Sequence, residues 1–162
     1  MIEINHRASG RPLLSLDTET LKRANLAGQY LIHADLRGAD LTAALLLFAN
    51  LSGADLRSAD LTGANLRGAN LTEVDLSGAD LYGVNLTGAT MSLTILSGCR
   101  NLHKAVGLET VVHPGPSELD SATLTDSAAH LPDSFLRGVG YTRSEINFLR
   151  RNYPAFPQSS SQ

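Results

Sequence analysis

The chain has 162 residues, of which 43% are hydrophobic and 5% aromatic, with no Trp and a formal net charge of -3. This length fits one domain with at most a small appended unit, and the mild charge excludes the strongly basic class of nucleic-acid-binding proteins. No apolar run approaches the ~20 residues of a membrane-spanning helix. Since Cys99 is the sole cysteine, an internal disulfide is excluded. These features predict a cytoplasmic protein without membrane or direct nucleic-acid partners.

Residues 1–23 precede the regular part of the sequence. Ile2 and Ile4 alternate with polar residues, and a second apolar run, LLSL, follows the turn signal Ser9-Gly10. Two short apolar runs around a turn are typical of a β-hairpin. We expect this hairpin to cover one end of the structure that follows, because an open edge exposes unpaired backbone.

Residues 24–98 repeat with a period of five. Of fifteen consecutive five-residue units, fourteen carry Leu at the third position and nine end in Gly. This period fits neither an α-helix, at 3.6 residues, nor a simple strand, at 2. It predicts a coil that turns a corner every five residues, with the Leu and the small residue two before it pointing inward. Gly suits the corner because it tolerates positive φ.

The units ADLRG, ADLTG, ANLSG and ANLRG resemble the pentapeptide-repeat family, whose motif is A(D/N)LXX. The resemblance implies an all-β repeat fold, a right-handed quadrilateral β-helix with four pentapeptides per coil. Residues 20 apart then stack on the same face, and the fifteen units make just under four coils.

The residue before each Leu differs between the faces of this expected helix. Two adjacent faces bear carboxylates, whereas the other two bear mainly Asn. The candidate acidic faces comprise Asp35, Asp55 and Asp75, and Asp40, Asp60 and Asp80. They are either a surface for a basic partner, partly neutralised by Arg37 and Arg57, or side chains that hydrogen-bond local backbone at the corners. For some members of the family, acidic surfaces of this kind imply mimicry of DNA and binding to DNA gyrase.

Two units depart from the motif, QYLIH at 29–33 and ALLLF at 44–48. They place large apolar side chains where other units have polar residues or Gly, and these form a candidate interaction patch: Tyr30, Ile32, Leu45, Leu47 and Phe48. An exposed patch of several large apolar side chains usually marks a contact site. The alternative is that the N-terminal hairpin or a loop covers the patch.

Residues 99–151 lose the five-residue register and predict a small helical cap, with residues 152–162 as a disordered tail or linker. A short helix is expected at 101–107, and Ser117 with Asp120 and Thr142 with Glu145 have the spacing of helix starts. The candidate cap contacts are Phe135, Ile146, Phe148 and Leu149. The segment 107–149 also resembles the part that follows pentapeptide repeats in some bacterial signalling proteins, where a TIR-type effector domain can come next.

No set of residues in the sequence has the pattern of a catalytic or metal site. The five histidines are scattered, and Cys99 lies where repeat meets cap, where we expect it to be buried and inert. We therefore predict no enzyme activity and no cofactor. The sequence indicates a protein–protein interaction or scaffold module, with another protein or a second copy as partner, as in the sensing or oligomerising part of a bacterial signalling or defence protein. The alternative is a DNA mimic that modulates DNA gyrase.

Overall fold

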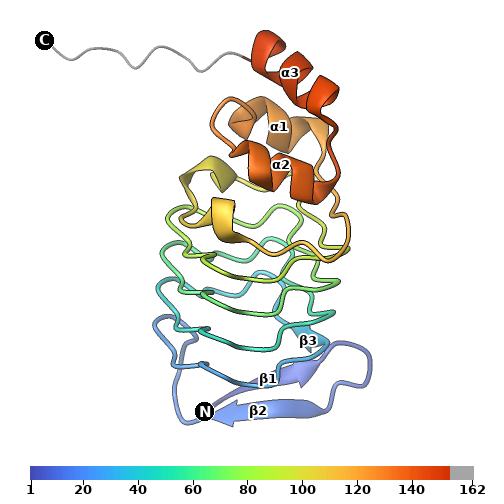
Figure 1. Ribbon diagram of the computed structural model, residues 1–162. Helices are drawn as coiled ribbons and strands as arrows, with labels where there is room; N and C mark the ends of the chain where they lie inside the picture. The colour runs from blue at the N-terminus through green and yellow to red at the C-terminus, as the bar shows by residue number, and fades with distance from the viewer. Residues whose placement is uncertain (154–162) are drawn as a thin grey trace, which may run out of the picture.

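The computed structural model describes residues 1–153. A hairpin lies at the N-terminal end of a stack of coils, and three helices lie at the other end (Figure 1). Of the expected tail, residues 154–162 lie outside the described part of the chain. No helix among the described residues is long and apolar enough to cross a membrane.

The stack is held together by parallel bridges between residues 20 apart. One ladder runs from Asn25 to Leu45, Asn65 and Asn85, and three equivalent ladders begin at Tyr30, Asp35 and Asp40. Four ladders per turn make the coil four-sided, which agrees with the quadrilateral β-helix implied by the repeat. We number the sides as face 1 (24–28 and every 20 residues onward), face 2 (29–33), face 3 (34–38) and face 4 (39–43).

The core consists of the repeated Leu and small residues. Leu26, Leu46 and Leu66 are each 0% exposed, as are Ala44 and Ala64. The fifth position of each unit has positive φ, and at Gly63 this angle is 65°. An L-residue is strained in this left-handed conformation, which explains why Gly is frequent there.

The side chain before each Leu stabilises the corner that follows. Thr42 donates its backbone N–H to Asp40 Oδ1 at 3.0 Å, and Thr72 donates to Asn70 Oδ1 at 3.0 Å. Because Asp and Asn both accept this bond, the fold itself accounts for a polar residue at this position.

The coil continues beyond Gly98, where the regular spacing ends. Bridges join Asp80 to Arg100, Asn85 to Val106, Thr90 to Val112 and Ile95 to Glu118. The spacing thus grows from 20 to 21, 22 and 23 residues. Two short 3-10 helices, η1 (Leu102–Lys104) and η2 (Leu108–Thr110), lie between these bridges. Part of the segment expected to be helical cap therefore completes the fourth coil and adds three sides of a fifth.

The N-terminal hairpin consists of β1 (Ile2–His6) and β2 (Pro12–Leu16), paired antiparallel. β1 also pairs antiparallel with β3 (Ala34–Asp35), so that the hairpin extends face 3. Ile4 is 1% exposed and packs into the same apolar core as the first coil.

The cap contains α1 (Ser121–Ser127), α2 (Asp133–Val139) and α3 (Arg143–Asn152). The expected start at Ser117 is displaced, because Asp120 rather than Ser117 caps α1 and accepts the N–H of Thr123. The capping box of Thr142 and Glu145 begins α3. Over the stretch 101–107, helical structure is limited to η1.

Candidate interaction surface

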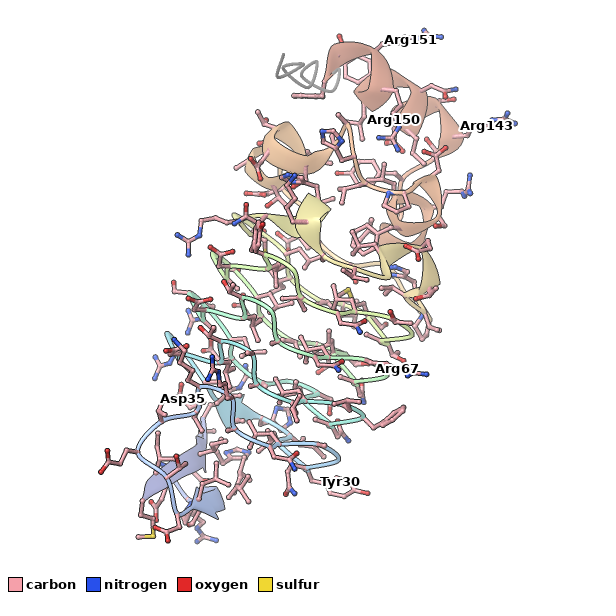
Figure 2. All side chains as sticks on the ribbon, turned by 90° about the vertical axis from the view of Figure 1, so that its left-hand side faces the viewer. Tyr30, Asp35, Arg67, Arg143, Arg150 and Arg151 are labelled. Atoms are coloured by element: carbon pink, nitrogen blue, oxygen red, sulfur yellow. The ribbon has the colours of Figure 1, made fainter. Side chains whose placement is uncertain are left out.

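Charged side chains are distributed unequally around the first four coils. Faces 1 and 2 together carry Arg67 and Glu73 as their only Asp, Glu, Lys or Arg residues. Faces 3 and 4 carry nine over the same coils: Asp35, Arg37, Asp40, Asp55, Arg57, Asp60, Asp75, Asp80 and Arg100. Tyr30 and Arg67 project from one side of the stack and Asp35 from the other (Figure 2). We call faces 1 and 2 the neutral half of the stack.

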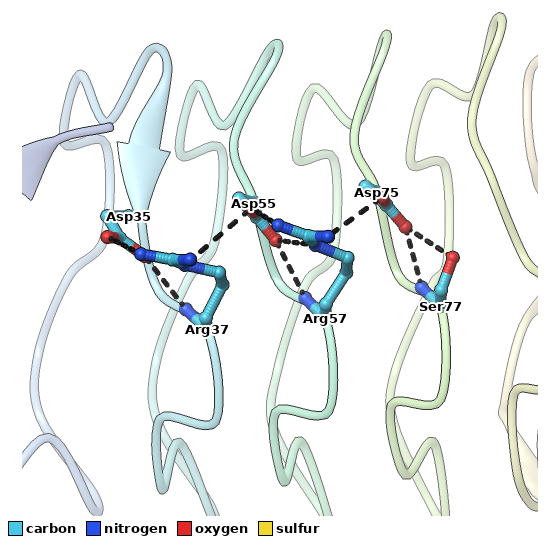
Figure 3. A network of polar contacts seen from close by, with 6 residues as sticks. All are labelled: Asp35, Arg37, Asp55, Arg57, Asp75 and Ser77. Atoms are coloured by element: carbon cyan, nitrogen blue, oxygen red, sulfur yellow. Dashed lines mark hydrogen bonds and ion pairs between the residues drawn. The ribbon is translucent and has the colours of Figure 1, made fainter. Parts of the chain in front are cut away.

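The carboxylates of face 3 form a ladder with arginines (Figure 3). Arg57 donates from Nε and Nη2 to the two carboxylate oxygens of Asp55, at 2.8 and 2.6 Å. Arg37 binds Asp35 in the same way, at 2.8 and 2.7 Å. Each guanidinium also approaches the carboxylate of the next coil, since Arg37 Nε lies 3.8 Å from Asp55. These arginines lower the pKa of Asp35 and Asp55. Much of the negative charge on face 3 is therefore compensated internally.

Face 4 is compensated only in part. Asp80 lies 3.6 Å from Arg100 and accepts a hydrogen bond from Asn101 at 2.8 Å. Asp40 and Asp60 form no ion pair within residues 1–153, and each accepts a backbone N–H, from Thr42 and Thr62. Two carboxylates thus remain available to a basic partner on this face.

Replacement of Asp55 by Asn should destabilise the stack by about 1 kcal/mol, because Asn keeps the acceptor for the Arg57 N–H but loses charge-assisted bonds. Arg57 lowers the pKa of Asp55 below its ordinary 3.8, so the carboxylate stabilises the fold above that pH. This contribution is lost as pH falls through the lower folded value. Chemical denaturation between pH 7 and pH 2 should therefore show a shallower acid loss in Asp55→Asn. Asp60→Asn is the control, with little change expected; equal effects of the two substitutions would contradict a role for the ladder.

The five residues of the candidate apolar patch all lie on the neutral half. Tyr30 is 76% exposed, Phe48 66%, Leu45 42% and Ile32 37%, and Leu47 is half-buried. The N-terminal hairpin pairs with face 3, and no described segment covers these exposed side chains. The alternative in which the hairpin covers the patch therefore does not hold.

Three further exposed apolar residues on the neutral half were not anticipated from the sequence. Leu93, Val106 and Val112 are 59%, 56% and 52% exposed. Leu93 ends the unit ATMSL, at a position where most units have Gly. This departure from the motif could have identified Leu93 from the sequence. Val106 and Val112 become assignable to faces 1 and 2 only through the bridges of the fifth coil. The apolar surface therefore extends along the height of the stack.

Two of these exposed apolar residues occupy strained corners. Phe48 has φ 55° and Leu93 has φ 54°, both in the left-handed region. The Phe48 ring also lies over Gly68, in space that a Cβ on Gly68 would occupy. A left-handed conformation costs a non-Gly residue about 1–2 kcal/mol. Gly would avoid this cost, so the backbone conformation of these two corners does not explain their large apolar side chains.

The candidate cap contacts divide into two groups. Phe135, Ile146 and Leu149 are buried, at 1%, 2% and 6% exposure, whereas Phe148 is 61% exposed. Arg150 holds α3 against the rest of the cap through Ala128 O, Leu131 O and the Asp133 carboxylate. The first three residues are therefore core of the cap, and Phe148 alone faces outward.

Cys99 is buried where the regular repeat ends. Burial raises the pKa of the Cys99 thiol to about 12, and its Sγ lies 3.1 Å from Leu76 O. A thiol with this pKa is not a nucleophile at neutral pH. Residues 1–153 contain no group of three or more His, Cys, Asp or Glu side chains that could hold a metal ion.

Comparisons with known proteins identify the same repeat. A model of pentapeptide repeats matches residues 21–57 and 59–98 in eight copies. A pentapeptide repeat protein of the cyanobacterium Cyanothece 51142 is 34% identical, covering 62% of this chain and 59% of that one, with a TM-score of 0.45. The chain thus spans 59% of the length of that relative.

None of the curated proteins matches the chain. Two further solved structures are similar to it in sequence. A pentapeptide repeat protein of Nostoc PCC 7120 is 30% identical, covering 72% of this chain and 83% of that one, with a TM-score of 0.28. A pentapeptide repeat protein from the thylakoid lumen of Arabidopsis thaliana is 28% identical. The match covers 82% of this chain and 88% of that one, with a TM-score of 0.35. Pentapeptide repeat proteins are in general non-enzymatic structural and interaction proteins. The repeat match, the identities and the four-sided coil together show that this chain belongs to the pentapeptide repeat family.

Proposed function

We propose that this chain is a non-enzymatic interaction module whose neutral half binds another protein, and that this partner is a second copy of the chain. The observation that carries the proposal is the presence of Phe48 and Leu93, exposed and apolar, at corners where their backbone is strained. Residues that a fold retains against its own stability are candidates for function.

The distribution of charge supports a second copy as the partner. Arg67 and Glu73 have opposite signs, so the neutral half has no net charge over the first four coils. Two such surfaces meet without electrostatic repulsion. Two copies of face 4 would instead bring Asp40 and Asp60 together, and close like charges are unfavourable across an interface.

Self-association would also suit the role that the resemblance of residues 107–149 implies, that of an oligomerising part of a bacterial signalling or defence protein. The exposed Phe148 on α3 offers a second place at which copies could meet. The neutral half is favoured because it presents seven of the ten large apolar side chains that are exposed in the described chain: Tyr30, Ile32, Leu45, Phe48, Leu93, Val106 and Val112.

The double substitution Leu47→Asp with Phe48→Asp is expected to make the protein monomeric, because it places two carboxylates inside the proposed contact. Light scattering after size-exclusion chromatography measures the mass over a range of micromolar concentrations. Tyr82→Asp is the matched control, since Tyr82 is 54% exposed on face 4, outside the neutral half. It should leave the oligomer intact. A wild-type chain that is monomeric throughout, or an oligomer unaffected by the double substitution, would refute the proposal.

Mimicry of DNA and binding to DNA gyrase is less well supported. The arginines of face 3 hold Asp35 and Asp55 in bidentate pairs, and Arg100 lies near Asp80. An unbroken run of unpaired carboxylates, which mimicry of a phosphate backbone requires, is therefore lacking on faces 3 and 4 of the described chain. Inhibition of gyrase supercoiling by the chain, relieved by Asp40→Asn with Asp60→Asn, would reverse this preference.

A further inference from the structure

His113 lies in the fifth coil, directly after the bridge residue Val112, and packs against α2. Its ring contacts Phe135 edge-on, with ring centroids 5.3 Å apart and an interplanar angle of 72°. It also lies against Gly138 so closely that a Cβ on Gly138 would overlap the imidazole. The imidazole is thus a main contact between the stack and the second helix of the cap.

The close approach of His113 depends on a glycine in the last turn of α2. Gly138 is the sixth of the seven residues of α2, and Gly is unfavourable in a helix relative to Ala. Its presence is explained by the His113 ring, which fills the space a side chain would need. An aliphatic side chain at position 113 could pack in the same space without bringing nitrogen atoms into the contact.

Both ring nitrogens of His113 are buried and have no hydrogen-bond partner. Buried polar groups are normally bonded, so an orphaned imidazole needs an explanation. The charged residues on the surrounding elements are Glu109, Glu118, Asp133 and Arg137, all of them exposed. Burial alone lowers the pKa of His113, and none of these charged side chains opposes that shift.

We propose that His113 makes the docking of α2 on the fifth coil sensitive to acid, so that protonation of its ring releases α2 from the stack. Release would expose the apolar face of α2, including Phe135 and Leu136, which are 1% and 0% exposed in the docked state. It would also uncover the part of the fifth coil that α2 covers. The proposal does not require that the neutral half binds a second copy.

Linkage between protonation and docking determines how the stability of the docked state changes with pH. The pKa of His113 in the docked state lies below its ordinary value of 6.5, which the ring regains once α2 has left. The released state therefore binds more protons, and docking is stable above about pH 6.5 and weakens as pH falls through the lower docked value. Between the two values, each pH unit shifts the equilibrium towards release by about tenfold.

Hydrogen exchange of backbone amides at pH 7.5 and pH 5.5 tests this proposal. After correction for intrinsic exchange, amides of α2 should lose up to about tenfold protection in total, all of it below about pH 6.5, while those around Leu46 and Leu66 keep theirs. In His113→Leu, the protection of α2 should not depend on pH. His130→Leu is the control, because His130 is exposed and should leave the acid response intact.

An NMR titration of His113 in the wild-type chain provides a second readout that needs no substitution. The proposal requires a His113 pKa below its ordinary value. A pKa at or above 6.5 would overturn it, as would an equal acid response in wild type and His113→Leu. A response confined to His103, which is also partly buried and lies near Asp126 and Ser127, would assign the effect to α1 instead and overturn the role of His113.

Discussion

Replacement of Leu66 by Ala is expected to lower the free energy of unfolding by about 2–5 kcal/mol. Leu66 is 0% exposed and lies on face 1 of the third coil, with further coils on both sides. The cavity cannot collapse easily, because the backbone around it is fixed by hydrogen bonds to the coils above and below, such as Leu66 N to Asn85 O at 2.9 Å. Denaturant unfolding monitored by circular dichroism measures the loss.

Thr87→Ala, on the same face one coil further, is a suitable control. Thr87 is only half-buried, and the substitution removes no part of the Leu core. A loss below about 1 kcal/mol for Leu66→Ala would show that the inner leucines contribute less than hydrophobic burial predicts.

Replacement of Gly107 by Ala is expected to cost about 2–5 kcal/mol, from about 1–2 kcal/mol of backbone strain and about 1–3 kcal/mol of overpacking. Gly107 has φ 81°, is buried, and leads into η2, where the fifth coil departs from the repeat. An added Cβ would lie 2.7 Å from the Cα and N of Thr87. Backbone atoms cannot rotate away, so the fifth coil must shift.

Gly63→Ala separates strain from overpacking. Gly63 has a similar left-handed conformation, with φ 65°, but a Cβ there would meet nothing within 4 Å. It should therefore cost only the backbone strain of about 1–2 kcal/mol. Equal thermal shifts for the two alanine variants would contradict the close contact between Gly107 and Thr87.

The sequence predicted those features that depend on spacing alone. The five-residue period gave the inward leucines and the corner glycines, and the 20-residue stacking followed from the resemblance to pentapeptide repeats. The alternation around the turn at Ser9-Gly10 predicted the hairpin. In each case a local physical requirement, such as positive φ at a corner, restricts the type of residue found at that position.

Features that depend on three-dimensional contacts were harder to predict. The fifth coil was missed because one to three extra residues separate its bridges, and the chain between Arg100 and Glu118 therefore loses the period. The sequence placed Arg37 and Arg57 on the acidic face but could not give their bidentate geometry. The unpartnered ring nitrogens of His113 depend on how α2 packs against the fifth coil, and the spacing of residues in the sequence does not predict that packing.

Phe48 and Leu93 allow the proposed contact surface to be changed without destabilising the fold. Substitution of both by Gly removes two apolar side chains from the neutral half and relieves two strained corners. The variant should unfold at the wild-type temperature or slightly above it, because the relief of strain offsets the loss of the Phe48 contact with Gly68. A folded, stable chain would then lack part of its contact surface.

The mass of this Phe48→Gly, Leu93→Gly variant, measured by light scattering beside that of the wild type, tests the central claim most directly. If the neutral half joins two copies, the wild type is an oligomer and the equally stable variant dissociates to the monomer at micromolar concentration. An oligomer of the same mass and concentration dependence in both proteins would contradict the account.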